Sequence, residues 1–203
     1  GQGGQNSIGP ERDDDLGALR TYELLKAMSV LRVDIGWLAD KRNNSIVDFG
    51  LSKSAEETFE FWDKNYTIKR MIRMVRAYKP DIIIPTFLDV NGQHGHHRSV
   101  TRATIEAYDK SNDPEMFPDD NFGPWKISQI FLPAWSGGGG SYDDEEDPPK
   151  ATHSIDVGNF NHIYGGTYNQ IGEWSRSYHA TQNIGKLAYE DKMDVPLHSV
   201  SYT

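Results

Sequence analysis

The feature that most constrains the fold is a run of three isoleucines, residues 82–84, held between Pro80 and Pro85. The run shows no alternation of apolar and polar residues, which is typical of a strand buried on both faces of a parallel sheet. A helical repeat of apolar residues over positions 68–75 precedes it, and Pro80 stops that helix. A helix, a tight turn and such a strand form one αβ unit, so the sequence predicts an α/β protein.

Size and composition limit the classes of protein further. The 203 residues suffice for one domain with a buried core, and we expect a single domain over residues 1–203, with a Gly-rich and acidic surface insertion at about 136–150. A net charge of −9 with scattered basic residues argues against a nucleic-acid partner. The absence of cysteine excludes disulfides and thiolate metal ligands. No apolar run approaches the roughly 20 residues of a membrane span.

The remaining elements are predicted from helix caps and short apolar runs. Helices are expected at four capping positions: residues 13–15, Ser54 with Glu57, Thr67, and Thr167, the last helix running through Tyr178. Strands are expected at three short segments: residues 46–49, 127–132 and 154–157.

The strongest chemical signal is His94-Gly95-His96-His97, in the loop that leaves the carboxyl end of the predicted strand. Ligands of open α/β sheets bind at this end, and neutral imidazole binds zinc or donates a proton to a polarised oxygen. His94 and His97 are three residues apart, so both can face one site if a helix begins near His97. Catalytic zinc usually has three protein ligands, so the cluster alone does not complete a site, and a surface histidine cluster is the alternative.

Three weaker signals accompany this loop. Arg20 and Glu23 lie on nearby turns of the first predicted helix, a spacing typical of exposed side chains. Asp48-Phe49-Gly50 is typical of a simple turn. The segment 175–179 ends in His179, and a lone histidine on a helix is more often packed or exposed than catalytic.

In their order along the chain, these segments resemble the PIG-L/LmbE-like family of N-deacetylases. The resemblance covers nearly the whole chain and rests on these segments: residues 3–11 with 16–24, Asp48-Phe49-Gly50, residues 79–85, His94-Gly95-His96-His97, and residues 155–168 with 175–182, which resemble a longer bacterial subgroup.

The resemblance implies a fold, a reaction and roles for residues. The fold is a three-layer α/β/α sandwich with a Rossmann-like, mainly parallel sheet. The reaction is hydrolysis of an N-acetyl group from an N-acetylglucosamine-type sugar conjugate, with one Zn²⁺ per complete site. His97 is implied as a metal ligand, His94 as an acid or oxyanion partner, and Arg20 and Asp48 as substrate contacts. Support for the site is expected from five further residues: His96, Glu23, Asp89, Arg176 and His179.

The chain departs from the family pattern at three places. The family's His-Pro-Asp-Asp segment supplies a histidine ligand, an aspartate ligand and the general base; it is absent here, and its place is upstream of Gly1. We therefore expect the first strand to lie outside this chain, and the missing segment or a partner chain to complete the site. His96 stands where the motif has aspartate, and Gly92-Gln93 replaces an aromatic residue sometimes found there.

Two other functions fit the same residues. One is a non-catalytic carbohydrate-binding or interaction subunit with the same fold. The other is a different metallohydrolase in which His94, His96 and His97 are all ligands. The sequence leaves oligomer formation open, and it is compatible with the bacterial cytoplasm as well as with export.

Overall fold

The computed structural model describes residues 3–40, 46–118, 121–136, 143–182 and 194–200. The α-helices of this part are α1 (Asp13–Leu31), α2 (Ala55–Trp62), α3 (Lys64–Tyr78), α4 (Gly95–Lys110) and α5 (Tyr168–Arg176), with a 3₁₀ turn η1 (Ala180–Gln182). The strands are β1 (Ile82–Ile83), β2 (Gln129–Pro133), β3 (His153–Asp156), β4 (Phe160–Asn161), β5 (Gly166–Thr167) and β6 (Asp194–Val200). Among the described helices, none combines the length and apolar character that crossing a bilayer requires.

The chain folds as two compact units. The first comprises Gly1–Gly36, Val47–Gly50 and Ser154–Val195, and the second comprises Trp37–Ile46, Leu51–His153 and Pro196–Thr203. The single domain expected over residues 1–203 stays a prediction.

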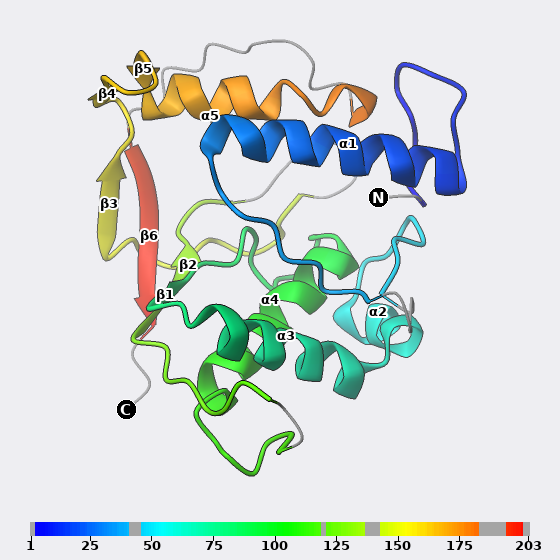
Figure 1. The fold of residues 1–203 in the computed structure, drawn as a ribbon, viewed down its shortest axis with the longest axis vertical. Coiled ribbons are helices and arrows are strands. Elements are labelled where there is room, and N and C mark those ends of the chain that lie inside the picture. Colours follow the sequence, from blue (N-terminus) through cyan, green and yellow to red (C-terminus); the bar gives the residue numbers. More distant parts are fainter. Residues whose placement is uncertain (1–2, 41–45, 119–120, 137–142, 183–193, 201–203) are drawn as a thin grey trace. The chain divides into compact units, whose positions relative to one another are not determined.

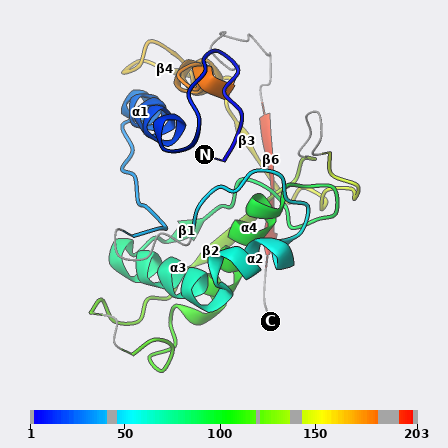
Figure 2. The same ribbon diagram turned by 90° about the vertical axis from the view of Figure 1, so that its right-hand side faces the viewer.

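The core of the second unit forms between α3, α4 and the chain that enters β2. In α3 the apolar residues Ile68, Ile72 and Val75 recur at helical spacing and are buried, Ile72 completely. They pack against two small residues of α4, Ala103 and Ala107, which let the two helices come close. Figures 1 and 2 show α2, α3 and α4 as neighbouring helices near β1 and β2.

The sheet of the second unit confirms the α/β class. β1 pairs with β2 in parallel, with Ile82 opposite Gln129, as the isoleucine run predicted. β2 then pairs antiparallel with β6, so the described sheet is mixed. The expected burial of both strand faces is wrong: Ile82 is 53% exposed, because β1 lies at the edge of the described sheet.

The first unit is built around two helices that lie side by side, α1 and α5 (Figure 1). The Oγ of Ser175 donates to the carbonyl of Ala27 at 2.8 Å and joins them at a buried point. Thr167 caps α5 in a full capping box, as predicted, although the helix ends at Arg176 rather than at Tyr178. β4 and β5 form a short antiparallel pair before this cap.

Two local predictions are wrong and one is confirmed. Thr67 lies inside α3, because Asp63 caps that helix by accepting from the N–H of Tyr66 at 3.1 Å. Residues 46–49 form no strand in the part of the chain that the structure describes. Ser54 caps α2, accepting from the N–H of Glu57 at 3.0 Å.

Candidate functional site

The histidine loop leads from β1 into α4, and His94 is the N-cap of that helix. His94 Nδ1 accepts from the backbone N–H of His96 at 3.1 Å, so an imidazole takes the capping role that Ser or Asp usually has at this position. The helix begins at Gly95, which places His94 and His97 at its first turn with ring centroids 5.2 Å apart. All three imidazoles are partly exposed.

Aromatic side chains fix the planes of two of these rings. The ring of His97 stacks on Phe87 with centroids 4.0 Å apart and an interplanar angle of 5°. The ring of His96 stacks on Trp62 at 5.0 Å, and its Nε2 is buried from solvent. His96 therefore packs against α2, which gives it a structural role where the family motif has aspartate.

Metal ions are bound by sets of imidazoles and carboxylates, and catalytic zinc usually has three such protein ligands. No group of three or more histidine or acidic residues within the described ranges is arranged to hold a metal ion. The alternative in which His94, His96 and His97 are all ligands is therefore contradicted. His97 fits as one imidazole ligand, and the other ligands of a complete site are not gathered around it in the described part of the chain.

Asp89 fixes the loop onto α4 through two guanidinium groups. Arg98 Nε donates to Asp89 Oδ1 at 2.9 Å and Arg102 Nε to Asp89 Oδ2 at 2.8 Å. The hydrogen bond to Asp89 raises the pKa of Arg102 above its ordinary value. Arg102 also donates to Glu56 of α2, and this hydrogen bond lowers the pKa of Glu56. A further role of Asp89 in the site stays a prediction.

Gly95 is a residue whose importance sequence reasoning missed. A Cβ at this position would collide with Ser52 Oγ and the carbonyl oxygen of Ser54, and would lie 2.8 Å from Thr58 Oγ1. The N–H of Gly95 also donates to the carbonyl of Ser52 at 2.8 Å. The family motif has proline at this position, whereas here only glycine allows the start of α4 to contact α2 this closely. The sequence does show a glycine between two histidines, but the need for glycine there follows from the contact of α4 with residues 52 and 54 in the folded chain.

Arg20 and Asp48 lie together in the first unit. Arg20 Nη1 is 3.9 Å from Asp48 Oδ2, with side chains 14% and 21% exposed. Arg20 also donates to the carbonyl of Gln5 at 2.8 Å. Asp48 Oδ1 accepts from the N–H of Gly50 at 2.9 Å, which forms the predicted turn. The exposed position that helical spacing favoured for Arg20 is wrong, because the side chain turns back onto the loop that precedes α1.

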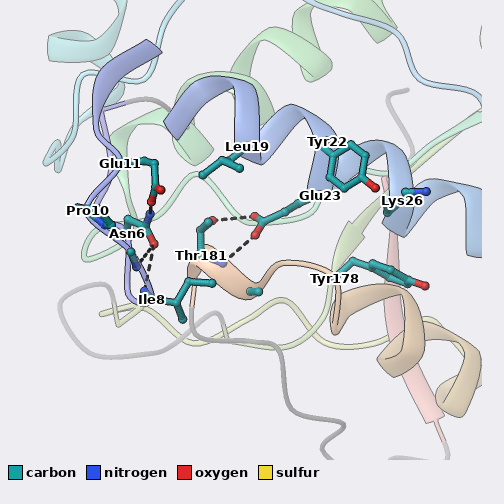
Figure 3. Close-up of a pocket in the computed structure, with 12 residues that line it drawn as sticks. Asn6, Ile8, Pro10, Glu11, Leu19, Tyr22, Glu23, Lys26, Tyr178 and Thr181 are labelled. Atoms are coloured by element: carbon teal, nitrogen blue, oxygen red, sulfur yellow. Dashed lines mark hydrogen bonds between the residues drawn. The ribbon is translucent and has the colours of Figure 1, made fainter. Parts of the chain in front are cut away.

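Glu23 is buried at 9% exposure and accepts from Thr181, from its N–H at 2.8 Å and from its Oγ1 at 2.7 Å. It lines a pocket of about 480 Å³ between α1, the N-terminal loop and the segment around η1, and Figure 3 shows Tyr22, Lys26 and Tyr178 at the same pocket. The two hydrogen bonds explain why Glu23 is buried although its spacing is typical of exposed residues.

The other two expected residues lie at the end of α5. The side chain of Arg176 is 52% exposed, with Nη1 at 3.5 Å from Glu173 Oε1. The N–H of His179 donates to the carbonyl of Arg176 at 3.0 Å. Both contacts are local ones at the C-terminal end of α5. The roles of the two side chains in a site stay predictions.

The sequence also matches a known protein family. The model of the PIG-L family, described as GlcNAc-PI de-N-acetylase, matches residues 1–108, which include the histidine loop, Arg20 and Asp48. The match covers more than half of the 203 residues, so the chain belongs to the PIG-L family.

Individual relatives agree with this assignment. The 1D-myo-inositol 2-acetamido-2-deoxy-alpha-D-glucopyranoside deacetylase of Streptomyces scabiei (strain 87.22) is 29% identical over 132 residues, which are 61% of this chain and 39% of the relative. The mycothiol S-conjugate amidase of Streptomyces coelicolor is 25% identical over 119 residues, 55% of this chain and 38% of the relative. The chain thus spans about two fifths of the length of these curated relatives.

A solved structure supports the fold. The conserved protein TT1542 from Thermus thermophilus superposes with a TM-score of 0.55 at 12% identity, covering 92% of this chain and 76% of that one. At this identity the likeness shows the fold alone.

Proposed function

We propose that this chain carries the histidine part of the active site of a metal-dependent hydrolase, which removes the acetyl group from an N-acetylglucosamine-type sugar conjugate. Metal dependence is general among deacetylases of this family, and the relatives named above are, by their names, a deacetylase of a 2-acetamido-2-deoxy-glucopyranoside of inositol and an amidase of mycothiol S-conjugates. Hydrolysis uses one water to split the amide C–N bond and gives acetate and a free amine.

The observation that carries the proposal is the hydrogen bond between His94 and the start of α4. Because His94 Nδ1 accepts the backbone N–H of His96, it has no proton of its own on that nitrogen. A neutral imidazole has one proton, so it lies on Nε2 and makes that atom a hydrogen-bond donor. A fixed donor of this kind stabilises the negative oxygen that develops when an amide carbonyl is attacked. The geometry therefore favours the oxyanion role for His94 over the acid role.

The other proposed roles follow the family pattern on this chain's own residues. His97 supplies one ligand to a metal ion, Zn²⁺ in our proposal, which when bound polarises the carbonyl and activates water. Arg20 and Asp48, paired at 3.9 Å, contact the sugar. We further propose that the remaining ligands and the general base come from a segment outside the described residues, in the same polypeptide or in a partner chain, since the described part shows no complete ligand group.

The test is acetate release from the N-acetylglucosaminyl conjugate of inositol, with the protein expressed together with any sequence that its gene places before Gly1. His94→Ala is expected to lower kcat by about 10²–10³-fold with little change in KM, because the donor acts on the developing oxyanion. His153→Ala is the matched control; this histidine is exposed and lies in β3. Undiminished kcat in His94→Ala would contradict the proposal, and binding of the conjugate without any acetate release would favour the non-catalytic alternative.

A further inference from the structure

The amide of Gln93 lies at the centre of a short chain of hydrogen bonds that ends on His97. Gln93 Oε1 is 2.8 Å from His97 Nδ1 and also accepts from the backbone N–H of His94 at 2.8 Å. Gln93 Nε2 donates to Asp144 Oδ1 at 2.9 Å. Gln93 is only 1% exposed, so water competes little for these hydrogen bonds.

The direction of each hydrogen bond follows from Asp144. A carboxylate only accepts hydrogen bonds, so the NH₂ group of Gln93 faces Asp144 and the amide oxygen faces His97. An amide oxygen also only accepts, so the proton between Gln93 and His97 belongs to His97 Nδ1. A neutral imidazole has one proton, and His97 therefore has its lone pair on Nε2.

We propose that Gln93 is a positioning residue that holds His97 in the Nδ1–H tautomer, the form that offers Nε2 to a metal ion. Ligating histidines generally donate their other ring N–H to a fixed acceptor, which sets tautomer and orientation together. The stacking on Phe87 fixes the plane of the same ring. The identity of the metal rests on the proposed function, whereas the tautomer does not.

The acidic segment 143–146 holds Gln93 in turn. The N–H of Glu145 donates to the carbonyl of Asn91 at 2.9 Å, and the N–H of Asn91 donates to Glu146 Oε1 at 3.3 Å. Gly92 has a φ of +85°, and a Cβ there would collide with the carbonyl oxygen of Asp143. This segment belongs to the expected surface insertion, of which residues 137–142 lie outside the described ranges. Its acidic part is largely exposed, as expected, and it also contacts the histidine loop.

The pair Gly92-Gln93 thereby gains a physical reason. Gly92 leaves room for the carbonyl oxygen of Asp143 against the loop. The hydrogen bond to Asp144 orients the amide of Gln93, so that its oxygen faces His97 as a fixed acceptor. The position where relatives sometimes have an aromatic residue is used here to set the state of a histidine.

The tautomer can be measured without metal or substrate, by long-range ¹H–¹⁵N correlation of the imidazole nitrogens at a pH where His97 is neutral. We expect wild-type His97 to be the Nδ1–H tautomer and Gln93→Leu to shift it toward Nε2–H. Asn91→Ala, in the same loop, keeps the two backbone hydrogen bonds of residue 91 to the acidic segment and is expected to leave the signals of His97 unchanged. A wild-type His97 in the Nε2–H form would overturn the proposal.

Zinc affinity provides the second measurement, by competition with a chelating dye on the protein expressed with any sequence its gene places before Gly1. Gln93→Leu is expected to weaken Zn²⁺ binding by about 10–100-fold. The double variant Gln93→Glu with Asp144→Asn restores an acceptor for His97 and a donor for residue 93, so it should recover both affinity and tautomer. Equal affinity of wild type and Gln93→Leu would overturn the proposal. A correct tautomer in a protein without deacetylase activity would uphold the role of Gln93 and reject only the proposed function.

Discussion

Gly95 gives the most specific structural prediction, because a single methyl group tests how closely α4 contacts α2. In Gly95→Ala the new Cβ meets Ser52 Oγ, Thr58 Oγ1 and the carbonyl oxygen of Ser54. The two side-chain atoms can shift a little. The carbonyl of Ser54 belongs to the backbone at the cap of α2, so the start of α4 has to move away and carry His94 and His97 with it.

The expected magnitude follows from two opposing effects. Alanine in place of glycine favours a helix by about 0.5–1 kcal/mol. Overpacking a close contact disfavours the folded state by about 1–3 kcal/mol, and the backbone contact places this case in the upper half of the range. The net loss in free energy of unfolding is therefore about 1–2 kcal/mol, which lowers Tm by about 2–8 °C for a chain of this size. Gly95→Pro, the residue of the family motif, adds the loss of the hydrogen bond to Ser52 and should lower Tm further.

The assay is thermal unfolding followed by circular dichroism, with Gly172→Ala as the matched control. Gly172 lies inside α5, and a methyl group added there would have no heavy atom of another part of the chain within 4 Å. The same substitution there should raise the stability by about 0.5–1 kcal/mol. The two variants thus differ in sign, and a Gly95→Ala protein as stable as wild type would refute the close-contact argument.

Three further predictions concern stability. Ile72→Ala, at a side chain with 0% exposure, should lower the free energy of unfolding by about 2–5 kcal/mol in urea titrations. Arg76→Met should lower it by at least about 3 kcal/mol by the same measure, because Arg76 donates to the carbonyls of Ser111, Asp113 and Phe117 and each hydrogen bond of a charged group is worth about 1.5–3 kcal/mol. An unchanged free energy of unfolding in Ile72→Ala or in Arg76→Met would contradict the reason given for that residue. The hydrogen bond from Arg102 lowers the pKa of Glu56 below its ordinary 4.5, so this pair stabilises the fold above that pH and the effect fades as pH falls through the lowered pKa. Glu56→Gln should therefore lower the free energy of unfolding at neutral pH by less than about 1 kcal/mol, since the Glu56 side chain is 67% exposed. Tm should fall slightly at neutral pH and stay unchanged in acid.

Local signals in the sequence were sufficient for the elements whose start and stop are set by neighbouring residues. Ser54 and Thr167 cap their helices as predicted, and Pro80 follows the end of α3. Thr67 was misjudged because a better cap, Asp63, lies four residues earlier, directly after α2. The isoleucine run gave the parallel pairing with β2 but not its exposure, since exposure depends on which strands lie beside it.

The site shows the same division between local and distant contacts. The four residues 94–97 alone were sufficient to predict that His94 and His97 lie together near the start of a helix, which is α4. The contact of Gln93 with Asp144 joins residues 51 positions apart, and no pattern within either segment indicates it. The collision at Gly95 arises between α2 and α4, and the burial of Glu23 depends on Thr181, which is 158 positions away. Contacts between residues so far apart in the sequence determine the orientation and burial of the site's side chains, and they can be found only once the fold is known.

Metal content and acetate release, measured on one preparation, decide whether His97 and His94 belong to a metal-dependent deacetylase site. For the protein expressed with any sequence its gene places before Gly1, we expect one zinc per chain and hydrolysis of an N-acetylglucosamine-type conjugate. We expect His97→Ala to lose both, and His94→Ala to keep the zinc and lose most of kcat. Full zinc content and full activity in His97→Ala would show that His97 is not a ligand of the site.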